Sequence, residues 1–154
     1  MKAEQINPFL IATHDVFQQM LGWELTRGQP FLPEGFAAQY EVTGVIGLTG
    51  ATTGTVALSM PRELALAVAE SLLGERPSDL TPQVADAVGE LTNMIAGAAK
   101  ARLEALQLSL GLPTVITGQS TAIAFPSRAV PIAIPFQSPR GPLVVEVGML
   151  PTTC

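Results

Sequence analysis

The apolar residues of this chain recur with two different spacings, and the first of these predicts which segments are helices. Over three segments they return every three or four residues, as on the buried face of an amphipathic helix. Asn7 and Pro8 are predicted to begin the first helix, and Gly22 to end it. Asp79 or Thr81 is predicted to cap the last helix. The predicted helices span residues 6–22, 61–74 and 81–108.

The second spacing is a strict alternation of apolar with polar or small residues, which is typical of half-buried strands. Residues 40–48 and 55–60 alternate in this way on either side of a glycine-rich turn, so they are predicted to form a hairpin. Two further strands are predicted over residues 130–136 and 143–149. Residues 23–37 carry mixed signals and are predicted to be a short strand or a loop.

The order of these elements predicts an α+β fold in which helices cover an antiparallel sheet. The chain runs from a helix to a hairpin, through two more helices, and then to a second pair of strands. That repeated order suggests a duplicated helix–hairpin unit, although the two halves share no convincing sequence identity. We expect residues 1–154 to form a single domain.

The composition of the chain excludes several classes of protein. The chain has 154 residues, of which 47% are hydrophobic and 14% charged, so a sizeable core is expected. Its net charge of −5 and its eight scattered Lys and Arg argue against a nucleic-acid partner. The single cysteine, Cys154, excludes an intrachain disulfide. An N-terminus without a signal peptide and the lack of a membrane-length apolar run predict a cytoplasmic protein that does not enter a membrane.

The last predicted helix carries the candidate chemistry on the side opposite its apolar face. Two interior glycines, Gly89 and Gly97, accompany this side, and each destabilises a helix by about 1 kcal/mol relative to alanine. Close approach of another backbone or protein surface would explain them. From spacing alone, however, such polar residues are most often simply solvated. The polar stripe consists of Asp86, Glu90, Asn93, Gly97 and Glu104.

The exact residues of this helix resemble the signature of the CheC/CheX family of chemotaxis phosphatases, which reads Asp or Ser followed by Glu-x-x-Asn. Here Asp86 precedes the segment Gly89-Glu90-Leu91-Thr92-Asn93-Met94-Ile95-Ala96-Gly97. Gly97 stands where CheC-type members tend to carry a second Asn, so the chain looks closer to CheX. Further similarity lies in Asn7-Pro8-Phe9, in the glycines of the first hairpin, and in residues 113–118.

The resemblance implies a phosphatase that removes phosphate from the aspartyl phosphate of a CheY-like response regulator. It implies that the amide of Asn93 orients the attacking water and that Glu90 pairs with a lysine of the regulator. Asp86, Gly89 and Gly97 are expected to contact the partner. No cofactor is then expected in this chain, because the Mg²⁺ would belong to the receiver.

The resemblance also implies one site per chain and a homodimer. The first helix reads Thr13-His14-Asp15-Val16-Phe17-Gln18, without the Glu-x-x-Asn that CheC-type proteins repeat there. CheX-type chains pair through their sheets, and the mean hydropathy of +0.37 is compatible with surface buried in a second subunit.

Two other functions stay open at this point. The chain could be a non-enzymatic CheC-like adaptor or scaffold that binds a receiver or a flagellar switch component, or a small-ligand sensor that uses its sheet face. Other motifs favour structural roles. His14 is the only histidine and lacks partners at metal-ligand or triad spacing, and the glycines from Gly44 to Gly54 lack the Lys-Ser/Thr of a phosphate loop. Which receiver, which pathway and what turnover rate apply cannot be deduced from the sequence.

Overall fold

The computed structural model describes residues 3–118 and 122–152, and Cys154 lies outside that range. It confirms the predicted α+β fold, an antiparallel sheet covered by helices. The helices are α1 (Ala3–Leu21), α2 (Arg62–Leu73) and α3 (Pro82–Ala101), with a 3₁₀ turn, η1, at Glu104–Leu106. The strands are β1 (Thr26–Arg27), β2 (Val42–Thr49), β3 (Thr52–Met60), β4 (Ser109–Leu110), β5 (Thr114–Thr117), β6 (Ile132–Ser138) and β7 (Gly141–Pro151).

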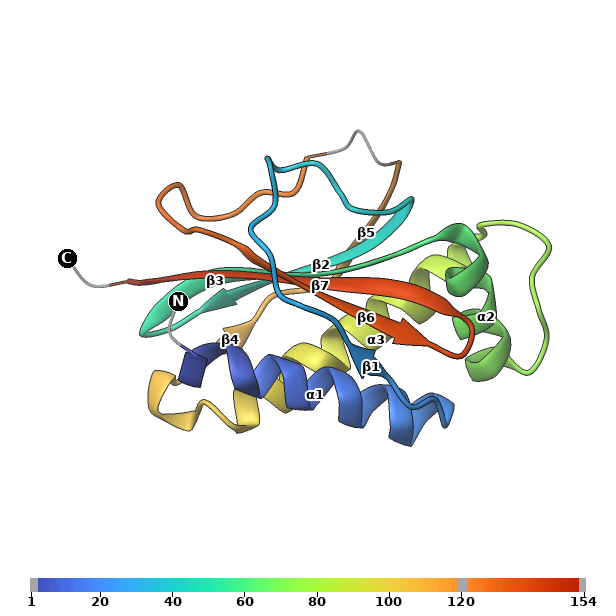
Figure 1. Cartoon of the computed structure of the whole chain (residues 1–154), viewed down its shortest axis with the longest axis horizontal. Coiled ribbons are helices and arrows are strands. Elements are labelled where there is room, and N and C mark those ends of the chain that lie inside the picture. Colours follow the sequence, from blue (N-terminus) through green and yellow to red (C-terminus); the bar gives the residue numbers. More distant parts are fainter. Residues whose placement is uncertain (1–2, 119–121, 153–154) are drawn as a thin grey trace.

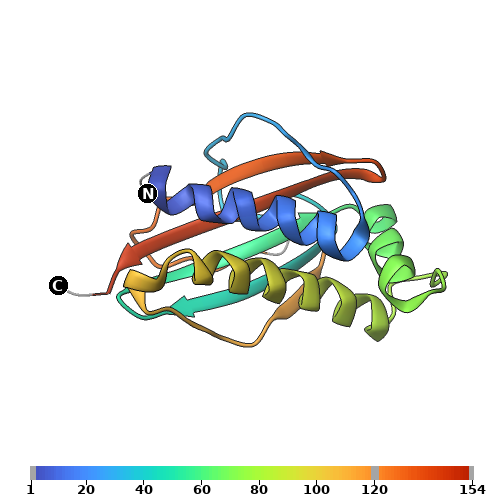
Figure 2. The ribbon, with the colours of Figure 1, turned by 90° about the horizontal axis from the view of Figure 1, so that it is seen from below.

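The strands form one antiparallel sheet in the order β1-β6-β7-β3-β2-β4, and β5 also pairs with β2. The two predicted hairpins, β2–β3 and β6–β7, meet through β3 and β7, where Val56 lies opposite Val147. Each hairpin therefore contributes its second strand to the centre of the sheet. Helices α1 and α3 lie side by side beneath the same face and run in opposite directions (Figure 2). This arrangement fits the helix–hairpin repetition in the sequence.

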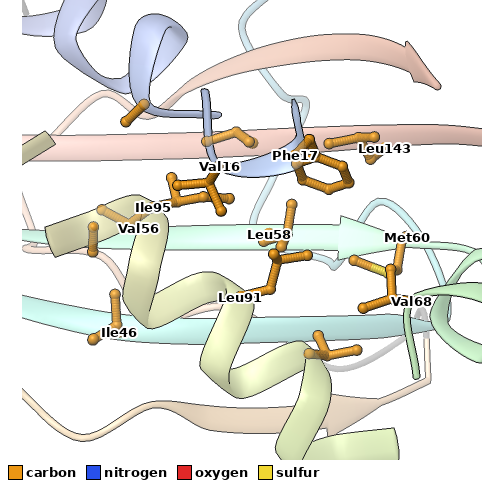
Figure 3. Packing of buried hydrophobic residues seen from close by; sticks show 14 of the residues in the cluster. Val16, Phe17, Ile46, Val56, Leu58, Met60, Val68, Leu91, Ile95 and Leu143 are labelled. Atoms are coloured by element: carbon orange, nitrogen blue, oxygen red, sulfur yellow. The ribbon is translucent and has the colours of Figure 1, made fainter. Parts of the chain in front are cut away.

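The core fills the space between these two helices and the sheet. Phe17 of α1, Leu91 of α3 and Leu58 of β3 are at most 1% exposed and gather at its centre (Figure 3). Burying each such side chain contributes about 1.5–3 kcal/mol. The far face of the sheet is covered by the segments that lead into β2 and β6 (Figure 1), where Ala38 and Ile123 pack on Ala57.

Three predicted helix ends are confirmed and two are wrong. Gly22 and Gly74 end α1 and α2 in the left-handed conformation, and Thr81 caps α3, accepting a hydrogen bond from the backbone N–H of Val84 at 3.4 Å. The first helix, however, already includes Ala3, so Asn7 is not its cap and Pro8 lies inside it. Because Ile6 packs against the core, the additional turn is stabilised by burial.

The third helix ends at Ala101 instead of near Leu108. The N–H groups of Arg102 and Leu103 bond to the carbonyls three residues back, at 3.0 and 2.9 Å, which tightens the last turn. The chain then bends so that Leu108 is buried and Leu110 pairs with Leu48 at the edge of β2. Burial of Leu108 thus competes with continuation of the helix and prevails.

A buried carboxyl group on the far face gives the fold a testable pH dependence. Glu146 of β7 is 1% exposed between Ala57 and Ala133, and its Oε1 accepts a hydrogen bond from Nε2 of Gln39 at 3.0 Å. Burial raises the pKa of Glu146 above the ordinary carboxyl range, and the bond from Gln39 offsets only part of that rise.

Glu146→Gln is therefore expected to stabilise the protein at neutral pH. The folded state binds the proton more tightly than the unfolded state, so the wild type loses stability as pH rises from the ordinary glutamate pKa through the raised one. The glutamine keeps an acceptor for Gln39 and carries no charge. Melting temperatures from about pH 4 to pH 8 should diverge in favour of the variant as pH rises, by about 2–4 °C for each kcal/mol. A variant less stable than the wild type at neutral pH would contradict this reading.

Candidate functional site

Helix α3 is held with one side against the core and the other toward solvent. Its apolar residues Val88, Leu91 and Ile95 are at most 1% exposed, and Leu91 and Ile95 point toward α1 and β3 (Figure 3). The buried Thr92 lies against β2, where its side chain sits directly over Gly44 and its hydroxyl donates to the carbonyl of Val88 at 2.8 Å. These contacts determine the rotation of the helix about its axis.

The opposite side of α3 presents the predicted polar stripe. Asp86 and Glu90 are exposed, and Asn93 is half-buried. Within the described part of the chain, the side chains of Glu90 and Asn93 make no hydrogen bond or ion pair. Residues three apart on a helix are surface neighbours, so a free carboxylate and a free carboxamide stand side by side. Such groups are available to a partner without first breaking a bond within the chain.

An open pocket of about 380 Å³ lies between the first half of the stripe and the edge of the sheet. Pro113 and Val115 form its far wall, and both of its charged lining residues, Asp86 and Glu90, are acidic. Neither carboxylate has an ion-pair partner among the residues described. The pocket therefore favours a cationic group, because two unpaired carboxylates attract positive charge.

The two glycines of the stripe differ in their surroundings. Gly89 is buried, and a Cβ there would lie 3.4 Å from Cγ2 of Val115 and 3.7 Å from Pro113. Gly89 thus lies close to the sheet edge and lines the acidic pocket. Gly97 is half-buried, and the nearest atom to a Cβ there is Cδ1 of Leu110 at 3.9 Å. A Cβ would therefore fit at either position, with more neighbours at Gly89 than at Gly97.

A second open pocket, of about 470 Å³, lies beyond Asn93 toward the end of α3. Gly97, Leu108 and Leu110 line it, together with the charged side chains of Lys100 and Glu104. Glu104 was predicted on the helical stripe, but it belongs to η1, because α3 ends at Ala101. The bend of the chain nevertheless brings Glu104 back beside Gly97. Asn93 thus lies between two pockets of different character.

Sequence reasoning missed the residues that complete these surfaces. Pro113 and Val115 belong to the β4–β5 edge, and Leu108 and Leu110 follow the unexpected end of the helix. No local pattern marks them as parts of a site, because Leu110 and Val115 are placed by pairing with β2 and Leu108 by burial after the helix ends.

The remaining sequence candidates lie apart from this surface. His14 contacts its neighbour Asp15 at 3.4 Å, and Asp15 also lies 3.8 Å from Arg102, all with exposed side chains. The stretch from Gly44 to Gly54 belongs to a hairpin packed in the sheet, not to a strand–helix junction. No three His, Cys, Asp or Glu residues of the described chain gather as metal ligands. Among the same residues, no helix is long and apolar enough to span a bilayer.

Comparison with known proteins points to one family. Residues 42–137 match the family model described as chemotaxis phosphatase CheX. The CheY-P phosphatase CheX of Thermotoga maritima is 29% identical over 126 residues, which cover 80% of this chain and 81% of that protein. A CheC-like superfamily protein of Shewanella sp. PV-4 superposes with a TM-score of 0.87 at 34% identity, covering 97% of this chain and 99% of that one.

A third similar structure contains a second protein. It is the CheX–CheY–BeF₃–Mg²⁺ complex of Borrelia burgdorferi, whose matched chain has a TM-score of 0.80 and 28% identity, over 94% of this chain and 97% of that one.

Proposed function

Because the chain belongs to the CheX family of chemotaxis phosphatases, we propose that it dephosphorylates the aspartyl phosphate of a CheY-like response regulator. The observation that carries this proposal is the pair Glu90 and Asn93, one turn apart on the solvent side of α3, neither bonded to any described residue. The CheY-bound structure of a family member supports the choice of partner. On the same basis we propose a cytoplasmic location.

Asn93 is proposed to position the water. A carboxamide can accept a hydrogen bond from the water and donate one to a phosphoryl oxygen, which holds the water oxygen in line with phosphorus. The water oxygen bonds to phosphorus as the bond to the aspartyl oxygen breaks, giving inorganic phosphate and a free carboxylate on the receiver. Phosphoryl transfer depends mainly on positioning and charge neutralisation, so this chain needs no general base.

Glu90 is proposed to dock the receiver by pairing with one of its lysines. The acidic pocket lined by Asp86 and Glu90 supports this role, since a lysine ammonium entering it would meet two carboxylates that lack partners among the described residues. Asp86 then acts as a supporting contact, while Gly89 and Gly97 leave room for the partner. The Mg²⁺ that neutralises the phosphoryl group is supplied by the receiver.

A homodimer is also proposed. Several large apolar side chains lie exposed in the segments that cover the far face of the sheet, away from α3. Burial against a second copy would remove this surface from water and leave the α3 stripe of each subunit open. The residues in question are Phe31, Leu32, Phe36 and Val130, which are 40–64% exposed.

The proposal is tested by adding the purified chain to a phosphorylated CheY-like receiver with Mg²⁺ and following phosphate release. We expect a shorter phosphate lifetime that scales with the concentration of the chain. Tight binding to the receiver with an unchanged lifetime would favour the adaptor function instead. If none of the receivers encoded near this chain bound to it or lost phosphate faster, that result would contradict both the phosphatase function and the adaptor function.

A further inference from the structure

We propose that the pocket beside Gly97 receives one bulky apolar side chain of the phosphorylated receiver. This inference rests on the proposed function and adds to it an anchor that holds the partner in register with Asn93. The pocket, of about 470 Å³, is large enough for a side chain of the size of leucine, methionine or phenylalanine.

The first argument is that the fold of this chain does not require a glycine at position 97. An interior glycine destabilises a helix relative to alanine. At Gly97 a Cβ would meet only Cδ1 of Leu110, at an ordinary 3.9 Å. The empty space beside Gly97 is therefore free for an atom from outside the chain.

The second argument concerns the lining of the pocket, which selects the kind of side chain. Leu108, only 3% exposed, and the half-buried Leu110 provide an apolar wall. Lys100 and Glu104 carry opposite charges, and neither has an ion-pair partner among the residues described. A charged side chain entering here would meet one attractive and one repulsive group, whereas an apolar side chain gains from burial.

The third argument is continuity with the reacting group. Gly97 lies four residues beyond Asn93 on the same stripe, which is about one helical turn or 5.4 Å along the axis. A receiver whose phosphoryl group reaches Asn93 must therefore also cover Gly97. The acidic pocket lies about the same distance on the other side of Asn93, so the two pockets would hold the receiver at two points with the water between them.

The test uses Gly97→Leu, which fills the pocket from within, and Gly97→Ala as a milder variant. Both should keep the fold, and the alanine variant should melt at a higher temperature because its helix propensity is better. With a phosphorylated receiver and Mg²⁺, we expect Gly97→Leu to raise KM about tenfold or more, the loss for one excluded apolar side chain, with kcat little changed. Gly97→Ala should raise KM less.

Ala105→Leu is the matched control. Ala105 is exposed on the neighbouring turn η1 and lines neither pocket, so the same leucine there should change neither KM nor kcat. Binding of the receiver loaded with BeF₃⁻ and Mg²⁺ should weaken for Gly97→Leu in the same proportion as KM rises. That measurement separates lost docking from slowed chemistry.

Three outcomes would overturn the anchor. Unchanged KM and binding in a folded Gly97→Leu would show that the pocket stays empty in the complex. A fall in kcat at constant KM would mean that position 97 affects the alignment of the reacting groups instead of docking. Equal weakening by Ala105→Leu would indicate a general surface effect. In each case the wild-type chain would still accelerate dephosphorylation, so the anchor can fail while the proposed function stands.

Discussion

Asn93→Ala is expected to abolish most of the acceleration of receiver dephosphorylation while leaving the protein folded. Losing one group that is positioned for the transition state typically lowers kcat by about 10²–10³. The Asn93 side chain is half-buried and makes no hydrogen bond to the described residues, so its removal should change the free energy of unfolding by less than about 0.5 kcal/mol. Stopped-flow or radiolabel measurements of phosphate release with saturating phosphorylated receiver would give kcat directly.

The chain contains its own control for this substitution, since Asn7 is its only other asparagine. Asn7 is exposed on α1, so Asn7→Ala removes the same carboxamide at a site outside the proposed interface and should leave kcat unchanged. Asn93→Gln keeps the carboxamide but moves it outward by one methylene. If activity depends on the exact location of the carboxamide and not only on its presence, this variant should recover little activity. Full activity in Asn93→Ala would exclude the proposed water-positioning role.

The side of α3 that faces solvent could be predicted from sequence, because the positions of the buried residues on a helix also determine which residues lie on its opposite side. Once Val88, Leu91 and Ile95 are assigned to the core, a spacing of 100° per residue places Glu90 and Asn93 outside. The long helices and the two hairpins followed from equally regular patterns. The function of the stripe, however, was predicted from its resemblance to a family signature. Its spacing alone is equally typical of a helix face that is simply solvated.

The walls of the two pockets could not be predicted in this way. Pro113 and Val115 approach α3 because β5 pairs with β2. Leu108 approaches α3 because the helix ends at Ala101 and the chain then bends, which buries the Leu108 side chain. Both events depend on contacts between residues far apart in sequence, and local propensity carries little information about those. Leu103 and Leu106 even continue the helical spacing, which is why the helix was predicted too long.

The expectation of one site per chain stays a prediction. α3 offers Glu90 and Asn93 without partners in the described chain, whereas His14 and Asp15 of α1 contact each other, and Asp15 also approaches Arg102. These exposed ion pairs are weak. Near its start, however, α1 carries Glu4 and Asn7, which are exposed, lie three residues apart and make no interaction with the described residues.

Gly44→Ala is expected to destabilise the protein, because position 44 of β2 lies directly against Thr92 of α3. A Cβ at position 44 would overlap the Thr92 hydroxyl and lie 3.1 Å from the Cβ of Thr92. Rotating Thr92 would sacrifice its 2.8 Å hydrogen bond to Val88, and its Cβ would remain in the way. Overpacking of this kind destabilises by about 1–3 kcal/mol, which should appear in the free energy of unfolding from urea titration.

A double-mutant cycle with Thr92→Ala tests whether this contact is the cause. Thr92→Ala alone should destabilise, because it removes buried contacts at the junction of α3 and β2. In the Gly44→Ala background the same change removes the overlapping hydroxyl, so the double variant should be more stable than the sum of the two single losses predicts. Strict additivity would mean that α3 is not seated on β2 through Gly44. The glycine would then have to be explained by the strand itself, and the rotation of α3 that turns Glu90 and Asn93 outward would depend on the apolar core alone.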